Sequence, residues 1–238
     1  MKAGGKRAFI LSLVLVLSGC GPRYFQGLIL PDITKYPLKQ IALLPFESAP
    51  GKGPSAAPNG GKQGEELTAF EGVRVEPEAQ KVITDIFMET IEKAGKYSLI
   101  PQEEVDTAMD RMELKMQEIS QREVVLKLGE GLRVDAIMVG SVFAYEERRG
   151  GPLAVDRPAT VGFTASLISI PDGKTLWTGN YFERQQSLTE NIALFPLFWK
   201  RHGQWLTARE LAEYGVEQVL KTWPVPQEDA ELKGKTPS

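Results

Sequence analysis

The sequence predicts one α/β domain of the α+β kind, in which helices flank a single mixed sheet. Three observations lead to this prediction. Apolar runs at 40–46 and 136–145 are typical of strands that are buried on both faces. An amphipathic segment at 77–94 indicates a helix. A strictly alternating pattern within 159–182, with a turn in its middle, indicates an antiparallel hairpin.

The remaining strand signals are shorter. The run at 97–100 is apolar and is closed by a proline, so it is expected to be a second strand. The segment 171–174, Pro-Asp-Gly-Lys, is the expected turn of the hairpin. The order of elements is therefore β, loop, α, β, α, α, β, β-hairpin, α.

Further helices are predicted by apolar residues that recur every three or four positions. The first, at 77–94, is followed by a glycine that suits its end. The next two are expected at 103–112 and 120–128, and the latter should stop at Gly129. The last helix is expected over 207–222, where prolines follow it.

Composition places the chain among ordinary globular proteins. Its 238 residues are 25% charged and 42% hydrophobic, which is enough for a substantial core. The net charge is −3, so no basic excess points to nucleic acid. The chain has one Cys and one His, which excludes an internal disulfide and a tetrahedral Cys/His zinc site. We therefore expect no metal and no cofactor.

The first nineteen residues have the pattern of an export signal. Lys2, Lys6 and Arg7 precede an apolar run over 9–17. This run is too short to span a bilayer but suits a signal peptide. Removal of residues 1–19 takes away these three cations and lowers the net charge from −3 to −6. The mature chain should not adhere to acidic lipid through its overall charge.

The signal ends in the sequence LSGC, which resembles the bacterial lipobox. The resemblance implies cleavage between Gly19 and Cys20, a diacylglyceryl group on the Cys20 sulfur and acylation of the new amino group. Several acyl chains hold a protein on a membrane far better than one does. Gly21, where an Asp would favour the inner membrane, favours the outer membrane. A plain secretory signal with an incidental cysteine is the alternative.

The mature chain divides into a membrane tether at 20–37, a domain at 38–226 and a polar tail at 227–238. Within the domain, 48–64 consists mostly of Gly, Pro, Ala and Ser. Such a segment buries too little apolar surface to offset its ordering entropy, so it should be a mobile loop.

Four stretches of this domain together resemble a superfamily of bacterial lipoproteins. They are IALLPF, IEKAGKYSLIPQEE, GLRVDAIMVGSVFAYEE and ASLISIPDGKTLWTG. The superfamily includes the curli-secretion lipoprotein CsgG, lipoprotein activators of penicillin-binding proteins and a group of neisserial-type lipoproteins. The resemblance spans about residues 39–222. It implies the fold of the N-terminal domain of TolB and a role in the cell envelope.

One feature argues against a secretion pore of the curli type, which needs long hairpins that cross lipid. The link at 146–158 is short and carries many charges, and the window at 183–203 is interrupted by Pro196. Neither suits membrane-spanning strands of about 9–11 alternating residues.

Motifs for catalysis are weak. Gly61-Lys62 lacks the Ser or Thr of a phosphate-binding loop, and Gly129-Glu-Gly131 lacks the third glycine of a dinucleotide fingerprint. Both are expected to be plain turns or links. His202 has no nucleophile motif beside it. Trp177 is expected in the core, and the pair Asp85 and Glu89 on the solvated side of the first helix.

The segment at 188–205 is the strongest candidate for an interaction site outside the anchor. It is irregular and strongly apolar around a proline, and aromatic residues are enriched at interfaces. A core plug and a contact with the membrane surface are the alternatives. The residues proposed for this surface are Leu194, Phe195, Leu197, Phe198 and Trp199.

Together these features predict a lipoprotein on the periplasmic face of the outer membrane, with the inner membrane as the alternative. Its partners would be the lipid membrane, through acylated Cys20, and an envelope protein or a second copy. Its function would be that of a non-enzymatic adaptor or assembly factor. An oligomeric curli-type secretion component and an envelope hydrolase are the alternative functions.

Overall fold

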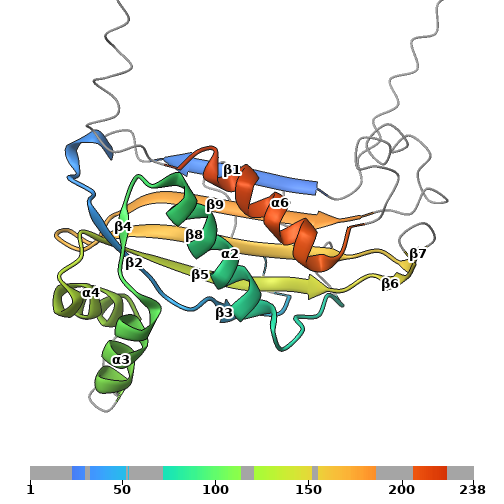
Figure 1. Ribbon diagram of the computed structural model, residues 1–238, viewed down its shortest axis with the longest axis horizontal. Coiled ribbons are helices and arrows are strands. Elements are labelled where there is room, and N and C mark those ends of the chain that lie inside the picture. The colour runs from blue at the N-terminus through green and yellow to red at the C-terminus, as the bar shows by residue number, and fades with distance from the viewer. Residues whose placement is uncertain are drawn as a thin grey trace, which may run out of the picture.

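The protein is a mixed sheet with helices on both faces (Figure 1). The computed structural model describes residues 23–29, 33–51, 53, 72–113, 121–151, 155–185 and 206–223. Helices α2 (Ala79–Ala94) and α6 (Ala208–Leu220) cover one face, while α3 (Gln102–Glu113) and α4 (Gln121–Leu132) pack on the other at one end of the sheet. The predicted α+β class is therefore confirmed.

Within the described residues, the remaining elements are strands and one short 3₁₀ turn. They are β1 (Arg23–Ile29), η1 (Ile33–Lys35), β2 (Gln40–Leu43), β3 (Glu47–Ser48), β4 (Ser98–Leu99), β5 (Ala136–Glu146), β6 (Arg149–Gly150), β7 (Val155–Arg157), β8 (Thr160–Ser169) and β9 (Thr175–Arg184).

The sheet has the strand order β1-β9-β8-β5-β2-β4, and β3 also pairs with β5. The neighbouring pairs β1–β9, β9–β8 and β8–β5 are antiparallel. Strand β2 runs parallel to both of its neighbours, β5 and β4. The predicted hairpin is confirmed as β8 and β9, which pair over almost their whole length. The link between β5 and β8 forms a small hairpin of its own, β6 and β7.

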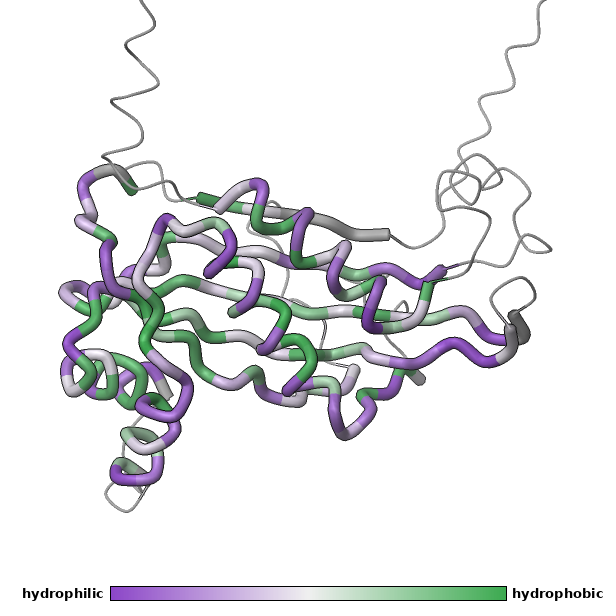
Figure 2. Tube along the Cα trace, viewed as in Figure 1, coloured by the Kyte–Doolittle hydropathy of each residue, from purple (hydrophilic) through white to green (hydrophobic). Residues whose placement is uncertain are grey.

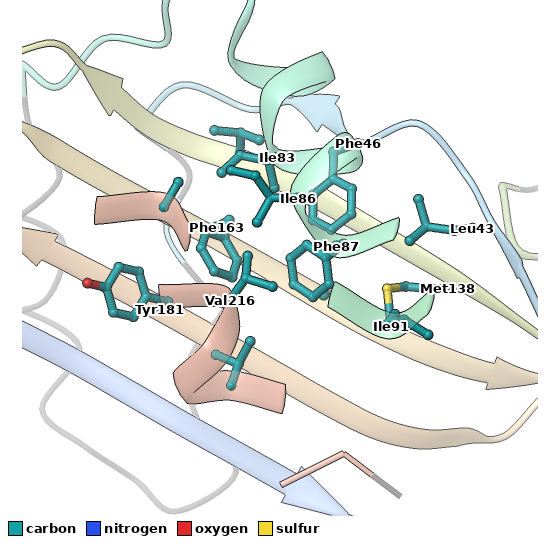
Figure 3. Close-up of a cluster of buried hydrophobic side chains, with 14 of the residues drawn as sticks. Leu43, Phe46, Ile83, Ile86, Phe87, Ile91, Met138, Phe163, Tyr181 and Val216 are labelled. Carbon is teal, nitrogen blue, oxygen red and sulfur yellow. The ribbon is translucent and has the colours of Figure 1, made fainter. Parts of the chain in front are cut away.

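The main core lies between the sheet and helices α2 and α6 (Figure 3). Phe87 of α2 is its centre, with its ring centroid 5.0 Å from that of Phe46 and 5.4 Å from that of Phe163. Phe163 in turn stacks on Tyr181 of β9 at 5.4 Å. Each fully buried aromatic side chain contributes roughly 1.5–3 kcal/mol to folding. The aromatic side chains thus join α2 to strands β8 and β9 and to the link between β2 and β3.

Helix ends follow local chemistry. Helix α2 stops because Gly95 adopts φ 62°, a left-handed conformation that a residue without Cβ tolerates. Helix α6 begins at a capping box, in which Thr207 and Glu210 satisfy each other's backbone N–H groups. Helix α4 differs from its prediction, since it does not stop at Gly129 but continues to Leu132. Gly129 is instead a packing position, where a Cβ would lie 2.2 Å from Cδ1 of Ile170 on the sheet.

Two further expectations are corrected by backbone pairing. Residues 23–29, assigned to the tether, form β1 and pair with β9, so the sheet starts before residue 38. Residues 48–51 are not a free loop, because Ala49 and Gly51 donate to the carbonyls of Val142 and Phe143 at 2.8 and 3.2 Å. The rest of 48–64, apart from residue 53, lies outside the described residues. So do 1–19 and 227–238.

The strand predicted at 40–46 ends early. Residues 40–43 form β2 and residues 47–48 form β3, with Pro45 between them. A proline has no N–H to donate to a ladder, which explains the interruption. The chain then re-enters the sheet on the other part of β5, so both short strands pair with the same neighbour.

Candidate functional site

A groove of about 940 Å³ lies on the second face of the sheet, beside α3 and α4. It exists because the two sheet faces are covered to different extents. Helices α2 and α6 cover the first face, whereas α3 and α4 pack over β2 and the beginning of β5. The central strand β5 was expected to be covered on both sides, but residues 139–141 are only half-buried. That prediction is corrected, and the half-covered stretch lines the groove.

Strands β5 and β8 supply the floor of the groove. Their register places Val139 opposite Ser166 and Ser141 opposite Thr164. These side chains share a face because residues two apart on a strand point the same way. Ser166 Oγ lies 3.2 Å from Thr178 Oγ1 of β9, so the hydroxyl row extends across a third strand. The floor therefore combines apolar surface with hydroxyls that can donate or accept hydrogen bonds.

Helices α3 and α4 supply an apolar wall. Met109 and Met112 of α3 and Val125 and Leu128 of α4 line this side. Methionine side chains are unbranched and adapt their shape to irregular partners. The wall is fixed to the sheet because Arg122 at the start of α4 donates a hydrogen bond through Nη2 to the carbonyl of Gly173, in the β8–β9 turn.

The rim of the groove is charged. Glu47 of β3 and Arg122 of α4 are the charged residues among its described lining. Asp106 and Asp110 on α3 are exposed and flank Met109 in the helix sequence. A ligand that suits this rim is apolar in its middle and carries positive charge at one side.

The groove has the chemistry of a binding site. Its lining contains serine and threonine hydroxyls, but no imidazole or thiol lines it within the described residues. A hydroxyl needs an adjacent general base to become a nucleophile. The described residues also hold no group of three or more His, Cys, Asp or Glu side chains placed to share a metal ion.

A carboxylate cluster occupies the other end of the sheet, beyond the end of β5. Glu147 Oε2 accepts a hydrogen bond of 3.0 Å from the backbone N–H of Ala208, at the beginning of α6. Glu76 Oε1 accepts one of 3.0 Å from the N–H of Glu147. A carboxylate at a helix N-terminus stabilises the unpaired N–H groups there. Burial, with the nearby charges of Glu147 and Glu76, raises the pKa of Tyr145 to about 12. These contacts hold together the segment around Glu76, the residue that follows β5 and the beginning of α6, so the cluster has a structural role.

The site residues predicted from sequence lie outside the described residues. This holds for Gly19 and Cys20 and for His202. It also holds for the whole proposed interaction surface: Leu194, Phe195, Leu197, Phe198 and Trp199. The anchor and this surface therefore stay predictions.

Other sequence predictions can be checked. Trp177 is 1% exposed, and its Nε1 donates to Thr222 Oγ1 at 3.0 Å, which confirms its place in the core. Asp85 lies on the solvent side of α2, 2.6 Å from Lys81 Nζ, and Glu89 is exposed. The segment 129–131 is not a link but the last turn of α4.

The groove itself was missed. Its signal was present in β8, where Thr164, Ser166 and Ile168 alternate with the buried side chains of the hairpin. That alternation indicates a face that is not fully packed. It does not show which part of the face α3 and α4 cover.

No helix of the described residues is long and apolar enough to cross a bilayer.

No protein-family model matches the sequence, and no curated protein matches it. Among solved structures, the PelC dodecamer from Paraburkholderia phytofirmans matches with 12% identity and a TM-score of 0.49, covering 86% of this chain and 99% of that chain. Lipoprotein GNA1162 from Neisseria meningitidis matches with 16% identity and a TM-score of 0.40, covering 68% and 91%.

The LpoB C-terminal domain from Salmonella enterica matches with 11% identity and a TM-score of 0.36, covering 62% of this chain and 83% of that chain. These likenesses concern the fold, at low sequence identity. GNA1162 is a neisserial lipoprotein. The likeness to CsgG and to the N-terminal domain of TolB stays a prediction.

Proposed function

We propose that this protein is a lipoprotein of the bacterial envelope that acts as a non-enzymatic adaptor or assembly factor. Its acylated Cys20 anchors it to the periplasmic face of the outer membrane. The observation that carries the adaptor role is the groove on the second face of the sheet, with its apolar wall and hydroxyl floor. The groove is large enough for a peptide segment, and its described lining contains no imidazole or thiol.

The occupant that fits this groove is an apolar segment of an envelope protein with cationic residues beside it. Apolar side chains of the segment would displace water from Met109, Met112 and Leu128. Its backbone groups would hydrogen-bond to the hydroxyls of the floor, and its cations would face Asp106 and Asp110. Charge complementarity of this kind speeds association and fixes orientation more than it adds affinity.

The lipid anchor supports the same role by confinement. A domain held at the membrane meets a partner in the same membrane at an effective concentration in the millimolar range for a short tether. A modest affinity at the groove is then sufficient for function. Both parts are needed, because the anchor sets the location and the groove selects the partner.

The anchor is tested by metabolic labelling with a palmitate analogue. The wild-type chain should be labelled and should partition into the detergent phase, and Cys20→Ala should lose both properties. Equal labelling of Cys20→Ala would refute the lipobox assignment. Intact mass of the purified chain then shows whether residues 1–19 have been removed.

The groove is tested by a photo-crosslinking amino acid at Val125, with Lys93 on the exposed side of α2 as the control position. We expect one crosslinked envelope protein from Val125 and none from Lys93. Mass spectrometry of the crosslinked peptide should show an apolar segment with Lys or Arg beside it. Ser141→Trp, which fills the floor, should abolish the product while the circular dichroism spectrum stays unchanged.

Two outcomes contradict the proposal. A Val125 product that survives Ser141→Trp would mean that the groove does not bind the partner. A product that consists of two copies of this chain would replace the adaptor role by self-association.

A further inference from the structure

The end of the sheet opposite α3 and α4 carries a second, distinct surface (Figure 1). It consists of the end of β5, the β6–β7 hairpin, the beginning of β8, the end of β9 and the beginning of β1. The register joins these elements side by side, since Glu146 pairs with Thr160 and Thr160 with Arg184. On the next strand, Arg23 pairs with Glu183. In Figure 2 the chain around the β6–β7 hairpin is hydrophilic.

Covalent geometry places the proposed lipid anchor at this end. Cys20 precedes Arg23, the first residue of β1, by three residues. An extended chain spans at most about 3.6 Å per residue, so the two Cα atoms lie within roughly 11 Å of each other. The strands β1, β9, β8 and β5 are neighbours, and three inter-strand spacings amount to about 14 Å. The hairpin therefore lies close to the lipid surface whenever Cys20 is acylated.

Exposed arginines gather at this end. Arg149 of β6 and Arg157 of β7 are direct register partners, and both are exposed. Like charges placed opposite each other on two strands destabilise the pair. Arg184, at the end of β9, is exposed as well. An anion that contacts the guanidinium groups of Arg149 and Arg157 would relieve their repulsion, and phosphate fits guanidinium geometry particularly well.

Three acidic side chains at the same end accept hydrogen bonds from the protein, although the side chain of Glu147 is still 43% exposed. Glu146 Oε1 accepts a hydrogen bond of 3.3 Å from the N–H of Arg74. Glu147 Oε2 is bound to the N–H of Ala208. Glu183 is 4% exposed and accepts a hydrogen bond of 2.8 Å from the Tyr181 hydroxyl. Glu183 is thus withdrawn from solvent, whereas Arg149, Arg157 and Arg184 are exposed. The side chain of Asp156, the acid of the hairpin, is outside the described set.

Helix α3, at the opposite end, has the reverse charge. Among its described side chains, four exposed ones are acidic and one, Arg111, is cationic. The acidic residues are Glu103, Glu104, Asp106 and Asp110. A negatively charged membrane attracts the arginine end and repels this helix, so the field orients the domain although its net charge is negative.

We propose that Arg149, Arg157 and Arg184 bind the phosphate groups of anionic lipids and hold the β6–β7 end of the domain against the membrane. This inference rests on the proposed lipid anchor. Its occupant is the anionic lipid surface in which that anchor is inserted. In this orientation α3 and the groove beside it face away from the membrane, where the adaptor's partner has access to them.

The test uses the full lipidated chain in vesicles of phosphatidylethanolamine with roughly a quarter phosphatidylglycerol. The sulfur of acylated Cys20 is blocked, so a single engineered cysteine takes a fluorophore. One label is placed through Gly151→Cys, next to the hairpin, and the other through Asp110→Cys on α3. Lipids with a nitroxide on the headgroup then quench the fluorophore that lies nearer to the surface. We expect quenching at position 151 to exceed that at position 110 at least about twofold.

The matched variants carry the same change in net charge. R149E/R157E/R184E should lower quenching at position 151, because each cation lost from the surface shifts the orientation equilibrium roughly fivefold. K39E/K93E/K127E changes exposed lysines elsewhere in the domain and should leave this quenching unchanged or raise it. In vesicles of phosphatidylcholine the difference between positions 151 and 110 should shrink.

Three results would overturn the inference. Equal quenching at positions 151 and 110 would show that the hairpin does not face the membrane. An equal loss in both charge variants would show a net-charge effect without a specific surface. A chain whose intact mass lacks the lipid and that does not float with vesicles would refute the anchor itself, and with it this orientation. The first two results leave the anchor intact.

Discussion

The same substitution, Gly to Ala inside a helix, should have opposite effects on stability at two positions of this protein. Gly215 lies in α6 and Gly131 in the last turn of α4. Alanine is the better helix former by about 1 kcal/mol at an unhindered position. A Cβ at Gly131 would meet no atom within 4 Å, so Gly131→Ala should stabilise the fold by about 0.5–1 kcal/mol.

At Gly215 the new methyl group has no space. Its Cβ would lie 2.6 Å from both Cδ1 and Cε1 of Tyr181, well inside van der Waals contact. That ring is 1% exposed, stacks on Phe163 at 5.4 Å and donates through its hydroxyl to Glu183 at 2.8 Å. It therefore cannot move without breaking other contacts. Overpacking costs about 2–3 kcal/mol in such a site, which exceeds the gain in helix propensity and leaves a net loss of about 1–2 kcal/mol.

The assay is urea unfolding of the purified chain, followed by circular dichroism. Gly215→Ala should lower the midpoint and Gly131→Ala should raise it, and the melting temperature of Gly215→Ala should fall by about 3–6 °C. Replacing the ring, as Tyr181→Leu, should reduce the cost of Gly215→Ala, because interacting sites are not additive. If Gly215→Ala stabilised the protein as Gly131→Ala does, the close packing of α6 on β9 would be refuted.

Two further predictions concern buried polar groups. Thr222→Ala should destabilise the fold by about 1–2 kcal/mol, because the indole N–H of Trp177 loses its acceptor. Thr222→Ser keeps a hydroxyl and should retain most of the stability. Urea unfolding measures the free energy of unfolding of both variants, and equal free energies would contradict the hydrogen bond. Tyr145 has a pKa of about 12 in the folded protein against an ordinary value of 10, so its stabilising contribution is complete below pH 10 and is lost as the pH rises through 12. In a pH titration followed by phenolate absorbance, Tyr145→Phe should lack one tyrosine that ionises near pH 12 in the wild-type chain. If the tyrosine missing from the variant ionised near pH 10 instead, the raised pKa would be contradicted.

The secondary structure was well determined by local patterns. The hairpin β8–β9 follows from strict alternation, and α2 from an apolar stripe that ends at Gly95. Both signals come from neighbours in the chain, and short-range sterics and solvent exposure are enough to produce them. The alternation within 159–182 puts Val161, Phe163 and Leu167 on one face of the hairpin, and all three are buried.

The errors have a common physical origin in contacts between distant segments. Gly129 does not end α4; it lies where the helix approaches Ile170 so closely that a Cβ would not fit. The segment 23–29 has no clear strand pattern of its own, yet the free edge of β9 gives its backbone a full ladder of partners. This backbone pairing requires that the edge of β9 be free to accept another strand. Which strand edges are free is decided only when the whole sheet has assembled.

The sequence by itself determined the class of the fold, and it predicts the address of this protein. A signal followed by LSGC is read locally by processing enzymes, and periodicity reports which residues avoid water, so neither requires knowledge of distant contacts. Only the tertiary structure decided where function can reside. The groove depends on how far α3 and α4 extend over β5 and β8, and the arginine surface depends on the register that brings Arg149 and Arg157 together near Arg184. Both arise from segments far apart in the chain, whose meeting is set by the packing of the whole domain.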